Sequence, residues 1–560
     1  MPETRKASCL FCSLQCGFGM EMDMDIPVRV DLDTEARANE GRLCARGHYN
    51  FELLLHPKRF LSATVNRRRV PLSSAVTKIA GKLSELRDAG GDSVGVILGT
   101  ELSNEDYDAA VAFADQVLGT KNLAVAYDGG DFPLLMGGGA GDATPEDLDD
   151  ADAFLLVGDV FWGHPCIAKR IIAARHSARQ NRIYTVNPFR TNTDWFADGH
   201  IQVPPDTEPV ALAAILKAMK AGVADVDMAK ACSICGTTAG DFDQVAKQLK
   251  EMEKVVVVTS SRFGDSTAAY LTGKLSKAIA KAARGKYAPF FRGGNAVGAF
   301  RRVGSKKTVP DILKAVETGR MKGLLVFGPD ILQLYPGTVS PDDLEKLELL
   351  ASSAIFETDI SKHSDAALPQ TAWTEMDGAY DASLTITNEV SRMAPPRGDA
   401  RSVGAMLKTL ASEVGAELDV SEAKAEHAPY DIDTNAALVG MMKEAEGTIE
   451  FVENIHPLHR WDGAITGRMS FPQAQKPYCE VWVSEPDADK LGIEQGSTIA
   501  LKSERGETRM LVTVTDRMPC GIVAVPSYVP DARGLFEWKP NEKTRWYDVS
   551  AVGAKVGPEE

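Results

Sequence analysis

Residues 9–16 read CLFCSLQC, and a fourth cysteine follows in the sequence GRLCARGH at residues 41–48. The spacing is Cys-x2-Cys-x3-Cys-x27-Cys. Cysteine thiolates bind iron–sulfur clusters, and three close cysteines can hold three corners of a cubane that a distant one completes. Structural zinc usually takes two separated Cys-x2-Cys pairs, so a zinc scaffold and unligated cysteines are the alternatives. We expect a 4Fe–4S cluster on four ligands: Cys9, Cys12, Cys16 and Cys44.

The residues around Cys44 resemble a known family. Residues 41–47, GRLCARG, and the cysteine spacing are similar to the cluster domain of the molybdopterin (bis-guanine-dinucleotide) oxidoreductases. That family includes formate dehydrogenases, nitrate reductases, formylmethanofuran dehydrogenase and the large iron–sulfur subunit of respiratory complex I. Its members carry Lys or Arg between cluster and pterin, two residues after the last cysteine. The resemblance therefore implies that Arg46 lies on the electron path and contacts the pterin; a solvated surface arginine is the alternative.

From residue 73 the chain alternates apolar runs with helical patterns. Helices are expected at 73–88 and 166–179, among others. The expected buried strands are 94–99, 153–160, 182–188, 255–260, 323–328 and 353–358. Such alternation predicts βαβ units and parallel sheets. The number of expected strands is larger than one ordinary domain contains. We expect an α/β fold with a cluster domain at residues 1–60 and two interleaved, doubly wound lobes within 61–414.

The C-terminal part has a different texture. Residues 415–448 are polar and rich in Ala and Glu, which is typical of a linker. Beyond them, short β-segments at 479–484, 497–503, 508–516 and 521–527 are separated by glycine-containing turns. These segments predict a small β-barrel. Because residues 487–506 resemble the family's C-terminal double-psi barrel, the resemblance implies a dinucleotide-binding barrel over 449–560.

Glycine and polar residues follow several of the expected strands. Ligands of doubly wound sheets bind at the carboxyl ends of strands, and glycine lets a phosphate approach the backbone. Each such end is also an ordinary turn. Residues 155–212, 292–299 and 356–378 resemble, in order, the family's pterin-dinucleotide segments. The resemblance implies these cofactor-binding residues: Arg46, Gly158, Asp159, His164, Asn187, Arg190, Asp206, Gly328, Thr358, Asp365, Gly378, Thr466 and Arg468.

The region of the family's metal ligand departs from the pattern. Catalytic members place Cys, selenocysteine, Ser or Asp on the metal, and formate dehydrogenase-like members follow the Cys or selenocysteine with His. Residues 121–152 contain no cysteine, serine or histidine. Asp128 or Asp131 could bind a hard molybdenum or tungsten centre through oxygen. The alternative is that both are turn residues beside two glycines, and Asp128 is the catalytic candidate we retain.

Two functions remain open from the sequence. The first is an oxidoreductase that transfers electrons between the cluster and a bis-pterin Mo or W centre, with formate or CO2 as the leading substrate. The second is an electron-relay or scaffold subunit that resembles the complex I subunit and carries no Mo or W. Because the chain shows no second cluster motif and no flavin or nicotinamide fingerprint, we expect iron–sulfur or flavin partner subunits in a heteromeric complex.

Composition narrows the class of protein. The 560 residues include 62 Lys and Arg and 78 Asp and Glu, giving a net charge of −16, which disfavours a broad nucleic-acid-binding surface. We see no signal peptide and no apolar run of about 20 residues, so we expect no membrane insertion. Nine cysteines, an odd number, argue against a disulfide framework and favour the cytoplasm. Cys232 and Cys235 form an unassigned pair, and we expect Cys166, Cys479 and Cys520 to be structural.

Overall fold

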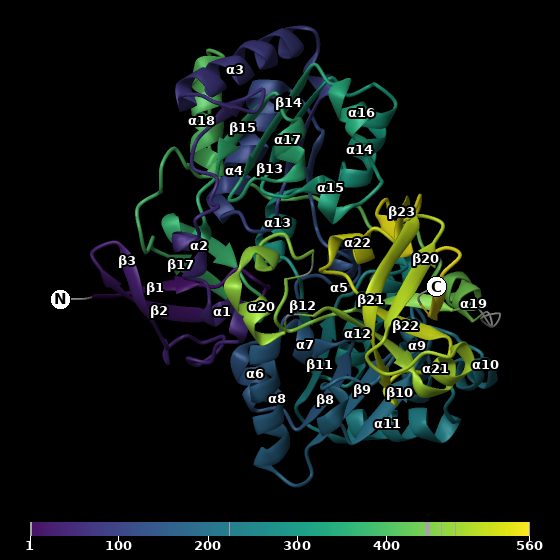
Figure 1. The fold of residues 1–560 in the computed structure, drawn as a ribbon. Coiled ribbons are helices and arrows are strands. Elements are labelled where there is room, and N and C mark those ends of the chain that lie inside the picture. The colour runs from purple at the N-terminus through teal and green to yellow at the C-terminus, as the bar shows by residue number, and fades with distance from the viewer. Residues whose placement is uncertain (1–2, 223, 443–448, 461, 477, 559–560) are drawn as a thin grey trace.

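The computed structural model describes residues 3–222, 224–442, 449–460, 462–476 and 478–558. In these residues the chain forms an N-terminal domain, two α/β lobes and a C-terminal β domain (Figure 1). The predicted α/β fold class is confirmed. The predicted domain boundaries stay predictions, and residues 443–448 of the predicted linker lie outside the described residues, as do 1–2 and 559–560 at the chain ends.

The N-terminal domain carries the cysteine motif on a hairpin loop. Its antiparallel strands are β1 (Glu3–Ser8), β2 (Gly17–Asp23) and β3 (Ile26–Asp31), and its helices are α1 (Ala45–His48) and α2 (Glu52–Leu55). The loop between β1 and β2 is closed because the Cys9 N–H donates to the Cys16 carbonyl oxygen at 2.9 Å. Three cysteines are thereby held at one end of the sheet.

The first lobe is built on a seven-stranded sheet in the order β5-β4-β15-β14-β13-β6-β7. Its strands are β4 (Thr64–Val65), β5 (Arg68–Arg69), β6 (Val94–Leu98), β7 (Leu123–Val125), β13 (Gly323–Phe327), β14 (Leu349–Ala354) and β15 (Ala366–Pro369). Its helices are α3 (Leu72–Asp88), α4 (Asn104–Ala112), α13 (Ala296–Arg302), α14 (Val309–Glu317), α15 (Ile331–Leu334), α16 (Pro341–Glu345), α17 (Asp359–His363) and α18 (Val403–Glu413). Helices α3, α4 and α18 lie on one side of this sheet and α14, α16 and α17 on the other (Figure 1).

The strand expected at 353–358 is wrong. The strand β14 covers Leu349–Ala354 instead, and it contains two consecutive serines that hide its apolar character. Both serines are buried because each has a hydrogen-bond partner: Ser352 pairs with Ser364 at 2.8 Å, and Ser353 donates to the Gln370 side chain at 2.9 Å. Satisfied hydroxyl groups can occupy a sheet interior at little cost.

The second lobe is inserted between β7 and β13 of the first, so the lobes interleave as predicted. Its parallel sheet has the order β10-β9-β8-β11-β12. The strands are β8 (Ala153–Val157), β9 (Arg182–Asn187), β10 (Gly199–Gln202), β11 (Val255–Ser260) and β12 (Lys286–Phe290). The helices are α5 (Asp131–Gly138), α6 (Pro145–Asp149), α7 (Val160–Gly163), α8 (Pro165–Ser177), α9 (Glu208–Ala218), α10 (Met228–Ile234), α11 (Ala239–Glu251), α12 (Ser266–Ala282) and α19 (Thr434–Met441).

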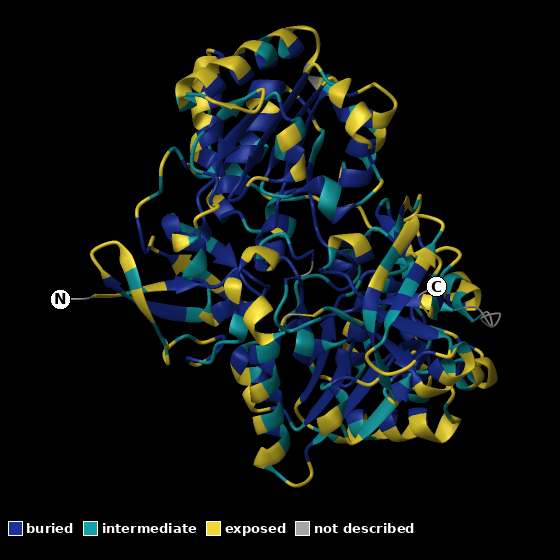
Figure 2. Cartoon of the chain, viewed as in Figure 1, coloured by how far each residue is buried: buried dark blue, intermediate teal, exposed yellow. Residues whose placement is uncertain are grey.

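Both faces of this second sheet are covered. Leu156 of β8 packs in one core with Ile167 of α8, and its neighbour Leu155 packs in another core with Leu271 of α12. Successive side chains of a strand point to opposite faces, so a strand buried on both sides must be apolar throughout. That requirement explains why the run AFLLV was recognisable as a strand, and Figure 2 shows both sheets as buried ribbon between more exposed helices.

The C-terminal domain is a curled six-stranded mixed sheet in the order β18-β22-β19-β21-β20-β25. Its strands are β18 (Glu450–Asn454), β19 (Glu480–Ser484), β20 (Thr498–Ser503), β21 (Gly506–Thr515), β22 (Ile522–Pro526) and β25 (Lys555–Pro558). Two hairpins, β16 (Gly378–Asp381) with β17 (Thr387–Val390) and β23 (Glu537–Pro540) with β24 (Tyr547–Ser550), and the helices α20 (Ser470–Gln475), α21 (Glu485–Leu491) and α22 (Pro530–Arg533) complete the described fold. Among the described residues, no helix is both long and apolar enough to cross a bilayer.

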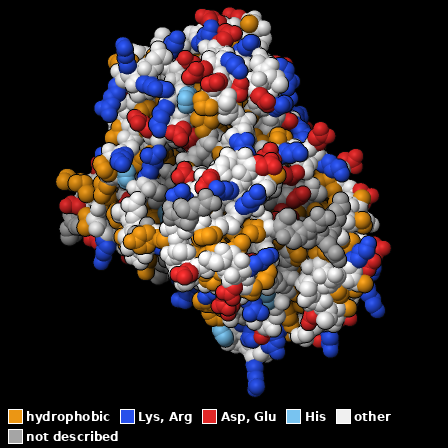
Figure 3. All heavy atoms as spheres, turned by 45° about the vertical axis from the view of Figure 1, so that its right-hand side comes forward, with side chains coloured by type: hydrophobic (Ala, Val, Ile, Leu, Met, Phe, Trp, Pro, Cys, Tyr) orange, Lys and Arg blue, Asp and Glu red, His pale blue; other side chains and the backbone are white. Residues whose placement is uncertain are grey.

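The surface mixes both signs of charge. Figure 3 shows Lys and Arg side chains interspersed with Asp and Glu side chains over one face of the molecule. Hydrophobic side chains gather at the left edge of that view, over the N-terminal sheet. The exposed apolar residues of this sheet are Met24, Ile26, Val28 and Leu32. They surround β3, which is an edge strand.

Candidate redox centre

The four motif cysteines gather in one buried region. Cys9, Cys12 and Cys16 are buried, and Cys44 precedes α1 in a half-buried position. Burial raises the pKa of the Cys9 thiol to about 12, and the neighbouring Cys44 and Cys12 add to that rise. Thiolates this deep need positive charge to form, and cluster iron supplies it. The donor set therefore fits a 4Fe–4S cluster.

Arg46 lies directly beside these cysteines and is fully buried. Its charge interacts with Cys44, Cys12 and Cys9, which raise its pKa against the lowering effect of burial. Its guanidinium also donates to the Gly163 carbonyl oxygen at 2.7 Å and to the His459 carbonyl oxygen at 3.3 Å. Arg46 therefore connects the cluster domain to the second lobe and to the segment between β18 and β19 of the C-terminal domain, and it is not a solvated surface residue.

A first pocket lies at the carboxyl edge of the seven-stranded sheet. It spans about 790 Å³, a volume that includes space open to solvent. Four predicted site residues line it: Asp128, Gly328, Thr358 and Arg468. Gly328 follows β13 with φ +103°, a conformation that favours glycine. Sequence reasoning missed Glu101 and Arg460, which form an ion pair in the wall of the same pocket.

Two further pockets lie at the carboxyl edge of the five-stranded sheet. They span about 410 Å³ and 330 Å³, volumes that include space open to solvent. Their predicted lining residues are Gly158, Asp159, Asn187 and Asp206. A Cβ on Gly158, which has φ +83°, would meet the Ser260 carbonyl oxygen at 2.4 Å. This glycine keeps the backbone open to close approach, as a phosphate-bearing ligand requires.

Six predicted cofactor residues do not line these pockets: Arg46, His164, Arg190, Asp365, Gly378 and Thr466. Asp365 lies at the amino end of β15, where it accepts the Leu350 N–H at 2.8 Å. Arg190 is exposed, and Thr466 is buried and accepts the Arg460 N–H at 2.9 Å. His164 is fully buried near Arg46 and Arg292, and burial lowers its pKa well below the usual value. Their cofactor roles stay predictions.

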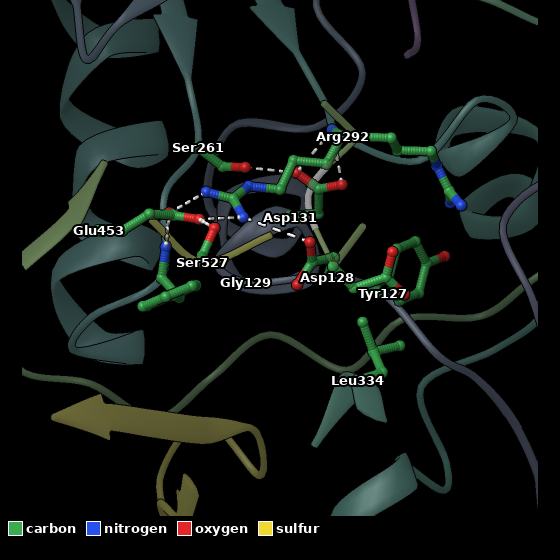
Figure 4. Close-up of polar contacts among 12 residues, drawn as sticks. Tyr127, Asp128, Gly129, Asp131, Ser261, Arg292, Leu334, Glu453 and Ser527 are labelled. Carbon is green, nitrogen blue, oxygen red and sulfur yellow. Dashed lines mark hydrogen bonds and ion pairs between the residues drawn. The ribbon is translucent and has the colours of Figure 1, made fainter. Parts of the chain in front are cut away.

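An ion-pair network lies between the pockets of the two lobes (Figure 4). Arg292, which follows β12, donates to Asp128 at 3.3 Å and to Glu453 of β18 at 2.8 Å. Arg533 of α22 donates to the other oxygen of Asp128 at 2.6 Å. Asp128 lines the first pocket and Glu453 lines the second, so Arg292 bridges them.

The network is buried and internally compensated. Arg292 and Arg533 are fully buried, and Glu453 and Asp128 expose 2% and 6% of their surface. Burial alone would raise the pKa of Asp128, but Arg533 and Arg292 outweigh it and hold that pKa below its usual value. Asp128 is therefore an ionised carboxylate, and each of its oxygens accepts a hydrogen bond from an arginine.

The neighbouring candidate, Asp131, is also engaged. Its carboxylate accepts the backbone N–H groups of Arg292 at 2.8 Å and Gly293 at 3.0 Å, and it pairs with the Ser261 hydroxyl. Burial raises its pKa to about 6 despite these donors. The residues present thus fit a cluster and a nucleotide better than a metal bound through aspartate.

Several residues of this centre cannot be found from local sequence patterns. Arg262 could have been found, because it follows β11 at the same sheet edge as Gly158. It pairs with Asp206 at 2.9 Å. Glu453 and Arg533 come from the C-terminal domain, and Arg533 is 405 positions from its partner Asp128. Cys166, expected to be merely structural, lies beside two of the cluster cysteines.

The overall fold matches that of a solved structure. Acetylene hydratase from Pelobacter acetylenicus superposes with a TM-score of 0.77 at 13% identity, covering 99% of this chain and 100% of that one. Family profiles match in the same order as the domains: a molybdopterin oxidoreductase Fe4S4 domain at 2–56, molybdopterin oxidoreductase at 73–413 and a molybdopterin dinucleotide-binding domain at 454–555.

The chain belongs to the molybdopterin oxidoreductase family. The F420-dependent formate dehydrogenase subunit alpha of Methanocaldococcus jannaschii is 21% identical over 649 aligned residues, which cover 94% of each chain. A nitrate reductase of Klebsiella oxytoca is 25% identical over 484 aligned residues, covering 74% of this chain and 55% of the relative. The Fe4S4 and dinucleotide-binding domains support both predicted cofactors, the 4Fe–4S cluster and bis-molybdopterin guanine dinucleotide.

Proposed function

We propose that the chain is an electron-transferring subunit that relays single electrons between a 4Fe–4S cluster on Cys9, Cys12, Cys16 and Cys44 and a pterin dinucleotide held between the lobes. The pterin and cluster together supply a path for one-electron steps. The chain's own residues hold the two groups, exclude water and place a permanent positive charge between them.

The position of Arg46 carries this proposal. It is buried beside three of the cysteines and donates to a backbone oxygen of the second lobe, at Gly163, where α7 ends. A cation there stabilises the added negative charge of a reduced cluster, since opposite charges in a buried site interact strongly. A guanidinium also keeps its charge at every physiological pH.

The contacts of Asp128 favour a relay over a catalyst at the metal. Both of its oxygens are held by arginines, at 2.6 Å and 3.3 Å. A metal cation bound to Asp128 would add positive charge beside Arg533 and Arg292, and like charges in a buried site repel strongly. We therefore infer that Asp128 is an ion-pair partner.

The second candidate is a Mo or W oxidoreductase acting on formate or CO2, with Asp128 as the metal ligand. Its support is the resemblance to formate dehydrogenase alpha subunits, at 21–22% identity. It requires Asp128 to bind a metal cation beside Arg292 and Arg533. Formate-dependent reduction of an artificial acceptor by the wild type, abolished in Asp128→Asn, would establish this candidate and reject the relay.

The relay itself is tested at Arg46. Arg46→Met should keep about four iron atoms per chain but lower the reduction potential of the cluster, because the reduced form loses its nearest cation. Arg46→Lys should restore most of the potential. Arg68→Met, on the exposed strand β5, is the matched control and should change nothing. An unshifted potential in Arg46→Met would remove Arg46 from the electron path.

Partners follow from the same proposal. Electrons must leave a chain with one cluster motif, so we propose iron–sulfur or flavin subunits in a heteromeric complex. Two similar relatives are themselves named as alpha subunits. The exposed apolar side chains around β3, including Ile26 and Val28 at 57% and 59% exposure, give a partner a surface on the cluster domain itself. Nine free cysteines support the cytoplasm as the location.

A further inference from the structure

A fifth cysteine lies against the four of the motif. Cys166 is the second residue of α8, in the second lobe, yet it is buried in the same core as Cys9, Cys12 and Cys16. Its thiol is in hydrogen-bonding contact with the side chains of both Cys16 and Cys44. Its Sγ also lies 3.5 Å from the carbonyl oxygen of Arg42.

The placement joins two separate parts of the chain. Cys16 comes from the hairpin loop and Cys44 from the start of α1, and Cys166 is the residue of the second lobe that contacts both. Pro165 opens α8 and leaves Cys166 in its first turn. The thiol is therefore held in place by a 13-residue helix, and it does not lie on the mobile surface of the protein.

Such a thiol acts on a cluster through its proton. Hydrogen bonds to the sulfurs of an iron–sulfur cluster and its ligands help to set the reduction potential. When Cys16 and Cys44 are bound to iron they carry no proton, so they can only accept, and Cys166 can only donate. A charged sulfur is a better acceptor than the neutral carbonyl of Arg42.

We propose that Cys166 is a positioning residue for electron transfer: it donates an S–H hydrogen bond to the iron-bound sulfur of Cys16 or Cys44 and so raises the reduction potential of the cluster. The inference rests on the proposed cluster function. Reduction adds negative charge to the sulfurs, which strengthens the hydrogen bond, so the reduced form gains more than the oxidised form.

The test compares Cys166→Ala and Cys166→Ser with the wild type in the full chain, purified without oxygen. Cys479→Ala is the matched control, because that half-buried cysteine directly precedes β19 in the C-terminal domain. Iron is counted in each protein, and the cluster is titrated by potential with its electron paramagnetic resonance signal as the readout. Iron in the wild type establishes the cluster independently of Cys166.

In Cys166→Ala we expect about four iron atoms per chain and a more negative potential. The ratio of reduced to oxidised cluster at a fixed potential should fall by up to about tenfold, which equals about 59 mV for one electron. Cys166→Ser should shift less, because its hydroxyl still donates, and Cys479→Ala should not shift. An unchanged potential in Cys166→Ala would overturn the proposal.

Two further outcomes would also reject it. Loss of iron from both Cys166 variants would make Cys166 a cluster ligand rather than a hydrogen-bond donor. A wild type that contains zinc in place of iron would reject the cluster function itself, and with it the role of Cys166. The iron count of the wild type thus separates failure of the inference from failure of the proposed function.

Discussion

The cluster site and the centre between the lobes are both buried and both rich in ionisable groups, but they are compensated differently. At the cluster site, four thiols share one nearby cation, Arg46, and burial raises the pKa of Cys9 to about 12. At the centre, Asp128 and Glu453 are matched by Arg292 and Arg533. The first site needs metal charge before its ligands can ionise, whereas the second balances its charges within the protein.

This difference indicates which of the two sites is suited to bind a metal. Buried charges are stable only when paired or bound to metal. The four cysteines beside Arg46 provide sulfur donors for a metal. A carboxylate held by two guanidinium groups is a poorer metal ligand. The hairpin of the N-terminal domain is therefore the site suited to bind metal. The central network instead joins the two lobes and the C-terminal domain.

The largest expected effect is at the cluster. Cys12→Ala should remove most of the iron and the visible cluster absorbance, because a cubane that loses one of its thiolate ligands is no longer held at that corner. Iron analysis and absorption spectroscopy measure this. Cys235→Ala, in the buried half of the unassigned pair, should keep full iron. A Cys12→Ala protein with intact absorbance would show that the ligand set is different.

The next effect is at the central network. Arg292→Met leaves Glu453 and Asp128 short of a cation, and it should lower the free energy of unfolding by about 3–5 kcal/mol. Urea unfolding followed by circular dichroism measures it. Lys121→Met breaks an exposed pair with Asp115 and should cost about 0–1 kcal/mol. Equal losses in the two variants would mean that the central network is no more than surface pairing.

A smaller effect is expected at the glycine beside the second pocket. Gly158→Ala forces a side chain into a left-handed conformation and against the Ser260 oxygen, at a cost of about 1–3 kcal/mol. Bound nucleotide should fall as well, measured by guanine released on denaturation. Gly467→Ala has open space around its Cβ and should be nearly silent. Retention of nucleotide by Gly158→Ala would place the ligand elsewhere.

Over a single pH unit, the smallest expected effect is a pH dependence of stability. Burial raises the pKa of Asp159 to about 7, and its partners are hydroxyl groups and a backbone N–H. A raised folded-state pKa means that the native protein binds more protons than the unfolded chain between about pH 4 and 7, so stability falls as pH rises through that window, by at most about 1.4 kcal/mol per pH unit. Asp159→Asn should remove this slope. A slope that persists in the variant would show that Asp159 is not its source.

Local patterns in the sequence were enough for the cluster motif and for most strands. The cysteines of the loop are neighbours in sequence, and runs such as VVVVTS at 255–260 are apolar because both faces of the sheet are covered. Strand β14 was misplaced because its paired serines are satisfied only by residues that the fold brings to them. Periodicity reports local burial and does not report distant partners.

The central network shows the limit most clearly. The sequence makes Asp128 a candidate metal ligand, with a turn residue as the alternative, because it stands in the region where the family has its ligand and carries a carboxylate. Arg292 lies 164 residues from Asp128 in sequence and Arg533 lies 405 residues away. No pattern near Asp128 in the sequence predicts these contacts. The same holds for Cys166, which is 122 residues from Cys44 in sequence but touches it in the fold.

The central claim is tested most directly by elemental and pterin analysis of the wild-type chain purified without oxygen, together with its reduced-state paramagnetic spectrum. The account predicts about four iron atoms per chain, a guanine-dinucleotide pterin and a cluster signal that appears on reduction. Zinc in place of iron, with no signal on reduction, would contradict it.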